Sequence, residues 1–223
     1  MKKEKLKQKL EIPDQKEIWD NISRKWCDYR NHSVPEVVEF LKDKKGKILD
    51  LGCGSGRNFV KADFETYGVD FSRKMIELAE KYAKKEKLKA KLFKKNAWEM
   101  DFPDNYFDSA VFIATLHCIP DEKHREESLK QLARVLKPGS RALITVWDKE
   151  QDRFKDMEKE ILLPWGTDEN GKRVEYMRYY YLYDKEEILA LLKKYFKIIK
   201  IYSKDVEGSR FKKKNLIIEV EKV

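Results

Sequence analysis

The sequence predicts a single α/β domain over residues 1–223, with a seven-stranded, mostly parallel sheet, an antiparallel last strand and helices on both faces. Two observations support this fold. Apolar runs alternate with amphipathic stretches through most of the chain, which is typical of parallel strands joined by helices. The last two apolar runs have no helix-length segment between them, so we expect them to pair as an antiparallel hairpin.

Seven short apolar runs are predicted to be the strands of this sheet. They cover residues 47–51, 66–70, 90–96, 109–114, 142–147, 196–203 and 215–223. In the strand order expected for such a fold, the third run lies at one edge of the sheet. The basic segment 210–214 falls at the tip of the last hairpin. It could be a solvated turn or could contact phosphate groups.

Five helices are predicted between and before the strands. Ser72 is the expected N-cap of one of them, whose apolar stripe has helical spacing. The others are expected over residues 14–28, 34–43, 122–136 and 184–194, and Pro138-Gly139 is the expected stop of the fourth. The chain then divides into a helical cover (1–45), a core (46–149), an insertion without predicted elements (150–182) and a last helix with two strands (183–223).

Composition narrows the class of protein. No apolar run approaches the ~18 residues of a membrane helix, and the basic N-terminus has no apolar core, so we expect a cytoplasmic protein without a membrane partner. Three widely spaced cysteines, Cys27, Cys53 and Cys118, indicate reduced thiols and no metal site. A net charge of +9 and many Lys and Glu residues fit either an RNA partner or a thermophilic source.

The most specific motif is ILDLGCGSGRN at residues 48–58. An apolar strand carries Asp50 near its end, and glycines follow at positions 52, 54 and 56. Gly52, Gly54 and Gly56 permit positive φ angles and let backbone N–H groups approach a ligand. A glycine-rich strand–helix turn without a ligand is the alternative, but the strand before it and the acid at the end of the next strand favour a cofactor site.

That acid is Asp70, which is placed to bind both hydroxyls of a ribose. Dinucleotide sites use GxGxxG, whereas this loop reads DxGxGxG and resembles motif I of class I S-adenosylmethionine-dependent methyltransferases. The resemblance implies a Rossmann-like fold, S-adenosylmethionine as cofactor, and Asp50 near the methionine amino group. It also places the adenine beside Asn96 and Ala97, where many relatives carry Asp. Phe71 and Trp98 are expected to flank the adenine ring, although core packing is an equal alternative.

Three further segments resemble the family of tRNA wobble-uridine carboxymethyl methyltransferases. They are YRNHSVPEVVEFL (29–41), residues 113–151 and RYYYLYDKEEILALL (178–192). The resemblance implies that the chain esterifies 5-carboxymethyluridine in a tRNA anticodon. Such a carboxylate is already ionised at neutral pH, with a pKa of about 4, so it needs positioning rather than a general base.

The same resemblance assigns candidate residues for the acceptor. Arg30 and His117 are the catalytic candidates: Arg30 as a clamp for the carboxylate, and His117 as a substrate-facing residue after the fourth strand. Trp147, Arg178 and Tyr179 are candidates for binding the uracil or the RNA. Each candidate has a structural alternative. Arg30 could be a surface arginine, His117 a structural histidine and Trp147 a core aromatic, and residues 178 and 179 could simply anchor their segment.

Relatives in this family work with a small zinc-binding activator protein that pairs along a sheet edge, here the predicted strand 90–96. Two other functions stay open at this point. One is a methyltransferase for a small molecule such as a quinone or an amine. The other is a non-catalytic, cofactor-binding RNA scaffold.

Overall fold

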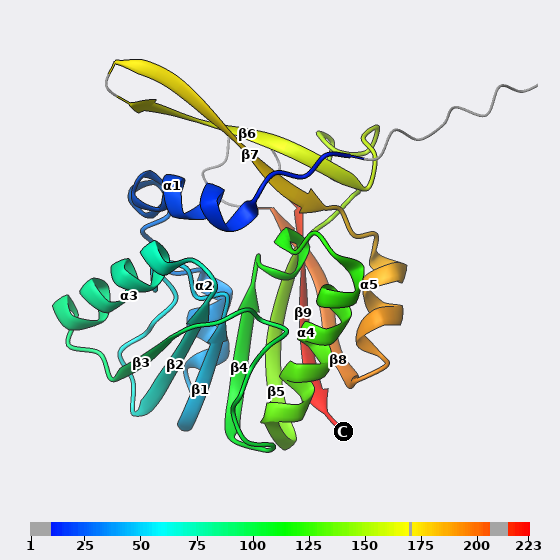
Figure 1. The fold of residues 1–223 in the computed structure, drawn as a ribbon. Helices are drawn as coiled ribbons and strands as arrows, with labels where there is room; N and C mark the ends of the chain where they lie inside the picture. The colour runs from blue at the N-terminus through cyan, green and yellow to red at the C-terminus, as the bar shows by residue number, and fades with distance from the viewer. Residues whose placement is uncertain (1–9, 170, 206–213) are drawn as a thin grey trace, which may run out of the picture.

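The computed structural model describes residues 10–169, 171–205 and 214–223, and it contains the predicted seven-stranded sheet (Figure 1). The strand order is β3-β2-β1-β4-β5-β9-β8. β1 to β5 are parallel, whereas β9 runs antiparallel to both β5 and β8. The fold prediction is therefore confirmed. The strands are β1 (Gly46–Leu51), β2 (Phe64–Asp70), β3 (Ala90–Lys94), β4 (Phe107–Ile113), β5 (Leu136–Trp147), β8 (Phe196–Asp205) and β9 (Lys214–Lys222).

The five predicted helices are present with small shifts at their ends. They are α1 (Gln15–Tyr29), α2 (Pro35–Leu41), α3 (Arg73–Lys85), α4 (Glu122–Val135) and α5 (Lys185–Leu192). The predicted stop of α4 at Pro138-Gly139 was late by a few residues, because β5 begins directly at Leu136. The basic segment 210–214 lies almost wholly outside the described residues.

Helices cover both faces of the sheet because its strands alternate their side chains between two apolar cores. On one face, Ile48 of β1 packs with Val37 and Leu41 of α2. On the other face, Leu49 packs in the cluster that includes the buried leucines of α4 and α5. The carboxyl ends of the parallel strands are left free for a site at one edge of this layered body.

The insertion, to which the sequence analysis assigned no element, forms an antiparallel two-stranded ribbon. Its strands are β6 (Glu160–Glu169) and β7 (Lys172–Tyr181), separate from the main sheet. The sequence did hold a signal for it, because residues 170–171 are Asn-Gly, a strong hairpin turn pair. Its polar composition and Pro164 hid the strands from a search for apolar runs.

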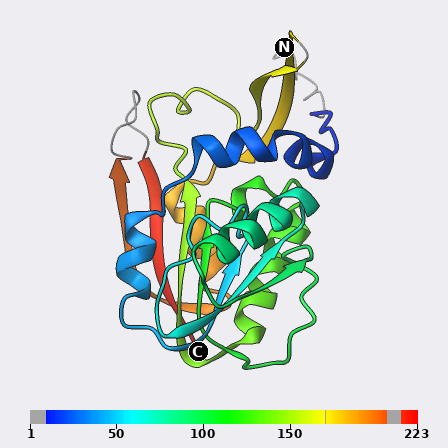
Figure 2. The same cartoon turned by 90° about the vertical axis from the view of Figure 1, so that its left-hand side faces the viewer.

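α1 and the β6–β7 ribbon together lie over the carboxyl ends of the parallel strands (Figures 1 and 2). The Gln15 side chain attaches α1 to β7: its Oε1 accepts the Tyr179 N–H at 2.8 Å, and its Nε2 donates to the Met177 carbonyl at 3.2 Å. Trp26 of α1 meets Trp165 of β6 with ring centroids 5.1 Å apart. The N-terminal helix and the ribbon formed by the insertion are therefore in direct contact above the sheet.

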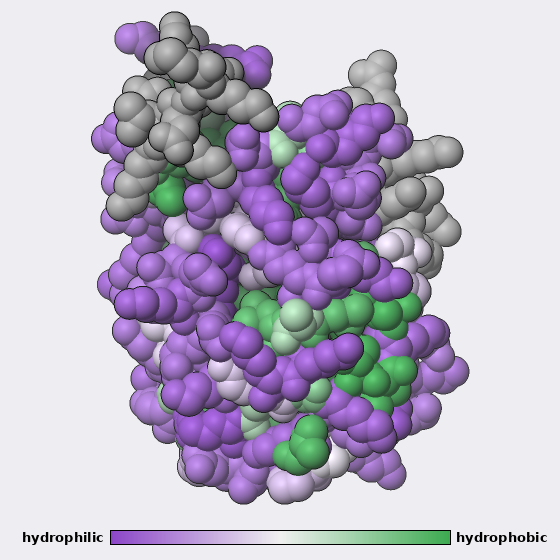
Figure 3. Space-filling model, turned by 90° about the vertical axis from the view of Figure 1, so that its right-hand side faces the viewer, coloured by the Kyte–Doolittle hydropathy of each residue, from purple (hydrophilic) through white to green (hydrophobic). Residues whose placement is uncertain are grey.

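The sheet ends at β3 on one side and at β8 on the other. The view toward the β8 end shows a mostly hydrophilic surface crossed by an apolar band at mid-height (Figure 3). Within the described part of the chain, none of the helices has the length and apolarity needed to cross a membrane.

Candidate functional site

The loop after β1 forms the floor of a pocket. Gly52, Gly54 and Gly56 all have positive φ angles, between 54° and 82°. A Cβ at Gly52 would lie 2.3 Å from the Thr115 side chain, so no larger residue fits there. A Cβ at Gly54 would meet nothing within 4 Å, because this glycine faces open space. The loop therefore presents bare backbone to a ligand, as its sequence predicts. We call this space the inner pocket; Gly52, Gly54, Asp70, Trp26 and Arg57 are among its lining residues.

Asp70 holds the loop and also lines the inner pocket. Its Oδ2 accepts the Gly54 N–H and its Oδ1 accepts the Ser72 N–H, each at 2.9 Å. Burial raises its pKa to about 6, and these two backbone hydrogen bonds oppose the rise. Each carboxylate oxygen can accept a second hydrogen bond. Asp70 is therefore placed to receive two neighbouring hydroxyl groups of a ligand.

Asp50 is buried beside this pocket without a partner. Its side chain is 2% exposed, and neither carboxylate oxygen has a hydrogen-bond partner among the described residues. Burial raises its pKa to about 7, while the positive charge of Arg57 lowers it and the charge of Asp70 raises it further. An orphaned buried carboxylate is unfavourable by several kcal/mol unless a cation joins it. The site therefore has the chemistry to hold an ammonium group.

A narrow apolar slot adjoins the inner pocket on the side of β3. Phe71, Ala97 and Trp98 line this apolar slot together with Asp70. The Trp98 ring is held in place by stacking on His124, with centroids 4.3 Å apart. Asn96 is not among the lining residues, and its Nδ2 donates to Glu99 Oε2 at 2.7 Å. The slot suits a flat aromatic ligand, and of the residues predicted to surround the adenine, Phe71, Ala97 and Trp98 line it whereas Asn96 does not.

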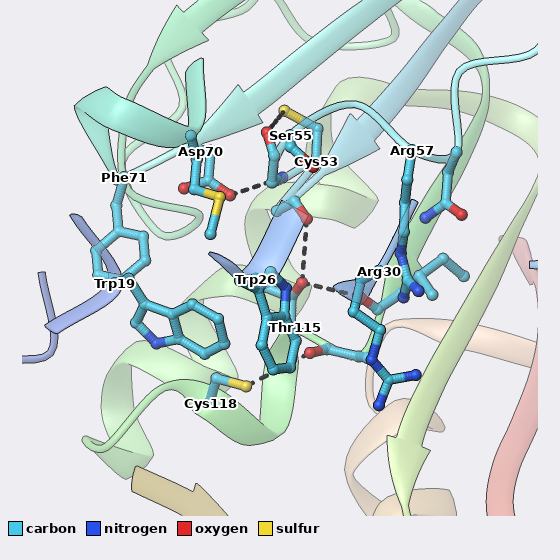
Figure 4. Close-up of a pocket in the computed structure, with 16 residues that line it drawn as sticks. Trp19, Trp26, Arg30, Cys53, Ser55, Arg57, Asp70, Phe71, Thr115 and Cys118 are labelled. Carbon is cyan, nitrogen blue, oxygen red and sulfur yellow. Dashed lines mark hydrogen bonds between the residues drawn. The ribbon is translucent and has the colours of Figure 1, made fainter. Parts of the chain in front are cut away.

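α1 closes the inner pocket from above. Trp19 and Trp26 are in edge-to-face contact at 5.1 Å, and Arg30 follows at the end of the helix. Figure 4 shows Phe71 and Trp19 on one side of the pocket and Arg30 with Arg57 on the other. α1 is fixed to α3 because Ser72 Oγ donates to Asp20 Oδ1 at 2.5 Å. Arg30 therefore lies at the end of the helix that closes the pocket and is one of the pocket's lining residues.

A larger cavity of about 400 Å³ opens beyond the inner pocket, and we call it the outer cavity. Arg30 and Arg57 line both spaces and so mark their boundary. No carboxylate of the described residues lies within 4 Å of either guanidinium. Burial lowers the pKa of Arg57 to about 10, and the charge of Arg30 lowers it further. The charge of Asp50 acts in the opposite direction and raises the pKa of Arg57. Two cations held side by side with no carboxylate in contact form a site for an anion.

His117 lies in the wall of the outer cavity, close to where the sequence predicts it. Its side chain is 1% exposed and both ring nitrogens lack hydrogen-bond partners within the described part of the chain. The ring stacks on Trp147 at 5.1 Å and on Tyr180 at 5.7 Å. Burial lowers its pKa to about 3, so the imidazole is neutral at physiological pH. It can donate or accept a hydrogen bond but is a weak base.

The three residues predicted to bind substrate take different positions. Trp147 lines the outer cavity, but its ring already stacks on Tyr180 at 4.1 Å and on Phe154 at 5.3 Å. Arg178 is 6% exposed and its Nη1 donates to the Tyr180 hydroxyl at 2.6 Å. Tyr179 is fully buried on the opposite side of β7, where its hydroxyl donates to Glu160. The structure does not support a substrate contact for Tyr179, because neighbouring residues of a strand face opposite ways.

Sequence reasoning missed several residues that line these spaces, and two of them carried a readable signal. Arg57 directly follows the last glycine of the motif, so it had to emerge near the ligand. Tyr180 shares its face of β7 with Arg178, as the period of two requires. Cys53 and Cys118 also line the inner pocket as free thiols whose pKa burial raises. The described residues hold no group of three or more side chains suited to a metal.

Comparisons with known proteins agree with this geometry. Residues 48–139 match the methyltransferase domain family. A probable tRNA methyltransferase 9B from Mus musculus is 28% identical over 67% of this chain and 33% of its own length. A tRNA (carboxymethyluridine(34)-5-O)-methyltransferase from Schizosaccharomyces pombe is 26% identical over 79% of this chain and 85% of its own length. The chain spans about a third of the length of the first curated relatives it matches.

Solved structures share the same fold. An S-adenosylmethionine-dependent methyltransferase from Methanosarcina mazei has a TM-score of 0.68 and 24% identity, covering 86% of this chain and 99% of that one. A 1,6-didemethyltoxoflavin-N1-methyltransferase from Burkholderia thailandensis, solved with S-adenosylhomocysteine, has a TM-score of 0.70 and 15% identity, covering 96% and 92%. At these identities the likeness shows the fold alone.

Proposed function

We propose that the chain is an S-adenosylmethionine-dependent methyltransferase that methylates the carboxylate of 5-carboxymethyluridine at the wobble position of tRNA. The match of residues 48–139 to the methyltransferase domain family and the fold shared with solved methyltransferases support the reaction class. The substrate comes from relatives that bear this activity in their names and are 26–30% identical to this chain. The geometry at the boundary of the two spaces supports the same acceptor.

The residues of the inner pocket and the apolar slot fit the cofactor. Asp70 would accept hydrogen bonds from both ribose hydroxyls, and the unpartnered carboxylate of Asp50 would join the ammonium group of the methionine part. Phe71, Ala97 and Trp98 would hold the adenine. When bound, S-adenosylmethionine supplies a methyl group that is activated by a sulfonium charge.

The observation that carries the proposed acceptor is the pair of Arg30 and Arg57. Both line the inner pocket and the outer cavity, and among the described residues neither has a carboxylate partner. A substrate carboxylate bound by this pair would lie at the junction of the two spaces. Arginine forks bind carboxylates with defined geometry, so they orient an oxygen for in-line attack. The chain thus contributes positioning and charge complementarity.

The weak basicity of His117 also favours an acceptor that is already ionised. Most hydroxyl, amine or ring-nitrogen acceptors lose a proton during methylation, which a general base with a pKa near 7 would take. Burial keeps the pKa of His117 at about 3, far below that range. A carboxylate has no proton to lose, so the neutral imidazole is no obstacle to its methylation.

The test is methyl transfer by the purified chain to an anticodon stem-loop RNA that contains 5-carboxymethyluridine. We expect one methyl group per RNA, and none when the wobble position is unmodified uridine. Transfer to quinone or amine acceptors in the absence of RNA would favour a small-molecule methyltransferase. Cofactor binding without transfer to any acceptor would instead favour a scaffold.

A small zinc-binding activator protein, pairing along β3, is part of the same proposal. β3 has five residues, lies at the sheet edge, and keeps Leu92 and Phe93 only partly buried. An unpaired edge offers backbone groups to a partner strand, although its lysines also discourage self-association. Full activity of the isolated monomer, with no gain from such a subunit, would contradict this part.

A further inference from the structure

We infer that a second anion subsite lies at the wall of the outer cavity, where Arg153 and the Tyr180 hydroxyl, backed by Arg178, bind the phosphodiester of the acceptor nucleotide. Trp147 and Tyr180 line this cavity, and Arg153 stacks on Trp147. This inference rests on the proposed function and deepens it, because it names the phosphodiester next to the modified uridine as the group of the RNA that this part of the site binds. The residues involved lie outside the glycine-loop motif and come from the segment 148–181.

Arg153 supplies the free cation of this subsite. Its Cζ lies 4.7 Å from the centre of the Trp147 ring and 4.0 Å from that of Phe154, so its guanidinium plane is supported by aromatic faces. Its buried Nε has no partner, and the described residues place no carboxylate within 4 Å of it. Stacking fixes the side chain but leaves its N–H groups available for an oxygen ligand.

The Tyr180 hydroxyl supplies a second donor. Its oxygen accepts a hydrogen bond from Arg178 Nη1–H at 2.6 Å, and the Arg178 guanidinium has no atom that could accept a hydrogen bond from the hydroxyl in return. Burial raises the pKa of Tyr180, so its proton is retained. In the described part of the chain that hydroxyl hydrogen has no acceptor, while the Tyr180 side chain lines the outer cavity. Arg178 therefore orients the hydroxyl as a donor and adds a positive charge behind it.

The grouping of these charges is unfavourable without an anion. Arg178 is only 6% exposed, and its Nε has no hydrogen-bond partner among the described residues. Burial is the main cause that lowers the pKa of Arg153, Tyr180 raises it, and the charges of Arg178 and Arg30 lower it further. By contrast, four arginines elsewhere in the described chain contact carboxylates: Arg73, Arg134, Arg141 and Arg173. An anion would offset both the repulsion and the burial of these charges.

The subsite presents donors only, which selects the kind of anion. A uracil edge would offer an N–H as well as carbonyl oxygens, and the acceptor atom of these two groups, the Tyr180 oxygen, already accepts from Arg178. The carboxylate of the acceptor is already assigned to Arg30 and Arg57 at the boundary with the inner pocket. A phosphodiester has only acceptor oxygens and a permanent negative charge, and every nucleotide within an RNA strand carries one beside its base. It therefore matches the donor set.

The experiment measures binding and transfer separately, with S-adenosylhomocysteine present in the binding arm. The RNA is an anticodon-loop oligoribonucleotide with 5-carboxymethyluridine, made with a normal phosphodiester or a neutral methylphosphonate next to that residue. The proteins are wild type, Arg153→Gln, Arg153→Lys and the control Arg173→Gln, an exposed arginine on the β6–β7 ribbon. Free 5-carboxymethyluridine nucleoside is the second acceptor in the transfer arm.

We expect Arg153→Gln to weaken binding of the normal RNA about tenfold or more and to lower the salt slope by about one. It should leave the kinetics on the nucleoside unchanged, and Arg153→Lys should restore part of the loss. The methylphosphonate should cause a similar loss in wild type and no further loss in Arg153→Gln, while Arg173→Gln changes nothing.

The inference is overturned if the methylphosphonate binds wild type as well as the normal RNA does, a result that needs no variant to fold. It is also overturned if Arg153→Gln weakens both RNAs equally or slows the nucleoside as much as the RNA. Because the binding arm needs no turnover, failure of methyl transfer to every acceptor would refute the proposed function and leave the binding result to decide this subsite.

Discussion

The two ends of the parallel sheet differ in how they treat their charges. At the amino end of the strands, Lys137 pairs with Asp108 and Arg134 pairs with Asp104. At the carboxyl end, Arg30 and Arg57 have no carboxylate partner among the described residues, and Asp50 has no hydrogen-bond partner there. The charged side chains named at the amino end therefore form ion pairs, whereas those around the cavities at the carboxyl end have no ion-pair partner among the described residues.

This difference separates residues kept for the fold from residues kept for ligands. Exposed ion pairs contribute only about 0–1 kcal/mol, so the amino end gains modest stability from them. Unpaired buried charges are unfavourable until a ligand of opposite charge binds. Substitutions at the two ends test this comparison, and we give them from the largest expected effect on binding, activity or stability to the smallest.

The largest effect is expected for Asp70→Ala. This change removes the acceptor of two backbone N–H groups and the proposed acceptor of two ribose hydroxyls. At about 1.5–3 kcal/mol for each charged hydrogen bond, affinity for S-adenosylhomocysteine should fall at least about 100-fold in calorimetry. The affinity of Asp70→Asn should lie between those of wild type and Asp70→Ala. Unchanged affinity in Asp70→Ala would contradict the assignment of Asp70 to the ribose.

Arg30→Gln should come next and act on transfer alone. Loss of one charged contact to the carboxylate should lower kcat/KM for the RNA acceptor about 10- to 100-fold. Affinity for S-adenosylhomocysteine should change less than about threefold, because Asp50 and Asp70 remain. Arg134→Gln is the paired control from the amino end, and an equal loss of activity there would contradict the comparison.

Asp50→Asn should stabilise the ligand-free protein while weakening cofactor binding. The folded pKa of Asp50 is raised to about 7, so its contribution to stability is present below pH 4 and is lost as the pH rises to 7. The Asn variant should gain roughly 2–4 kcal/mol over wild type at pH 8 and little at pH 4, measured by urea unfolding. Equal gains at both pH values would show that burial of charge is not the cause.

Arg141→Ala should have the smallest effect. Arg141 contacts Glu219 and Glu221 on the surface of the neighbouring strands β5 and β9. We expect unfolding free energy to fall by at most about 1 kcal/mol, with a smaller change in 1 M salt, and methyl transfer to stay at the wild-type rate. A clear loss of transfer would mean that the amino end is coupled to the site.

The sequence was sufficient for the sheet and the glycine loop because both depend on local patterns. The spacing of apolar runs predicted all seven strands, and the order of acid and glycines predicted the positive φ angles. The β6–β7 ribbon was missed because a two-stranded ribbon needs few apolar residues. Its Asn-Gly turn was the one local clue.

The site was only partly predictable because it depends on which way side chains face after packing. Arg178 and Tyr179 are neighbours in sequence, yet one backs the outer cavity and the other contacts Glu160 on the far side. The orphaned state of Asp50 and the neutral state of His117 are products of burial, which no spacing reveals. Arg57 was within reach of sequence reasoning, since it adjoins the last glycine.

The most direct test of the central claim is the chemical stability of the transferred methyl group. RNA containing 5-carboxymethyluridine is incubated with the protein and S-adenosylmethionine carrying a radiolabelled methyl group, and the product is then treated with mild alkali. A methyl ester of the carboxylate should release its label as methanol, and Arg30→Gln should reduce the amount formed. Label that stays on the RNA after this treatment would place the methyl group on nitrogen, carbon or ribose and would contradict the account.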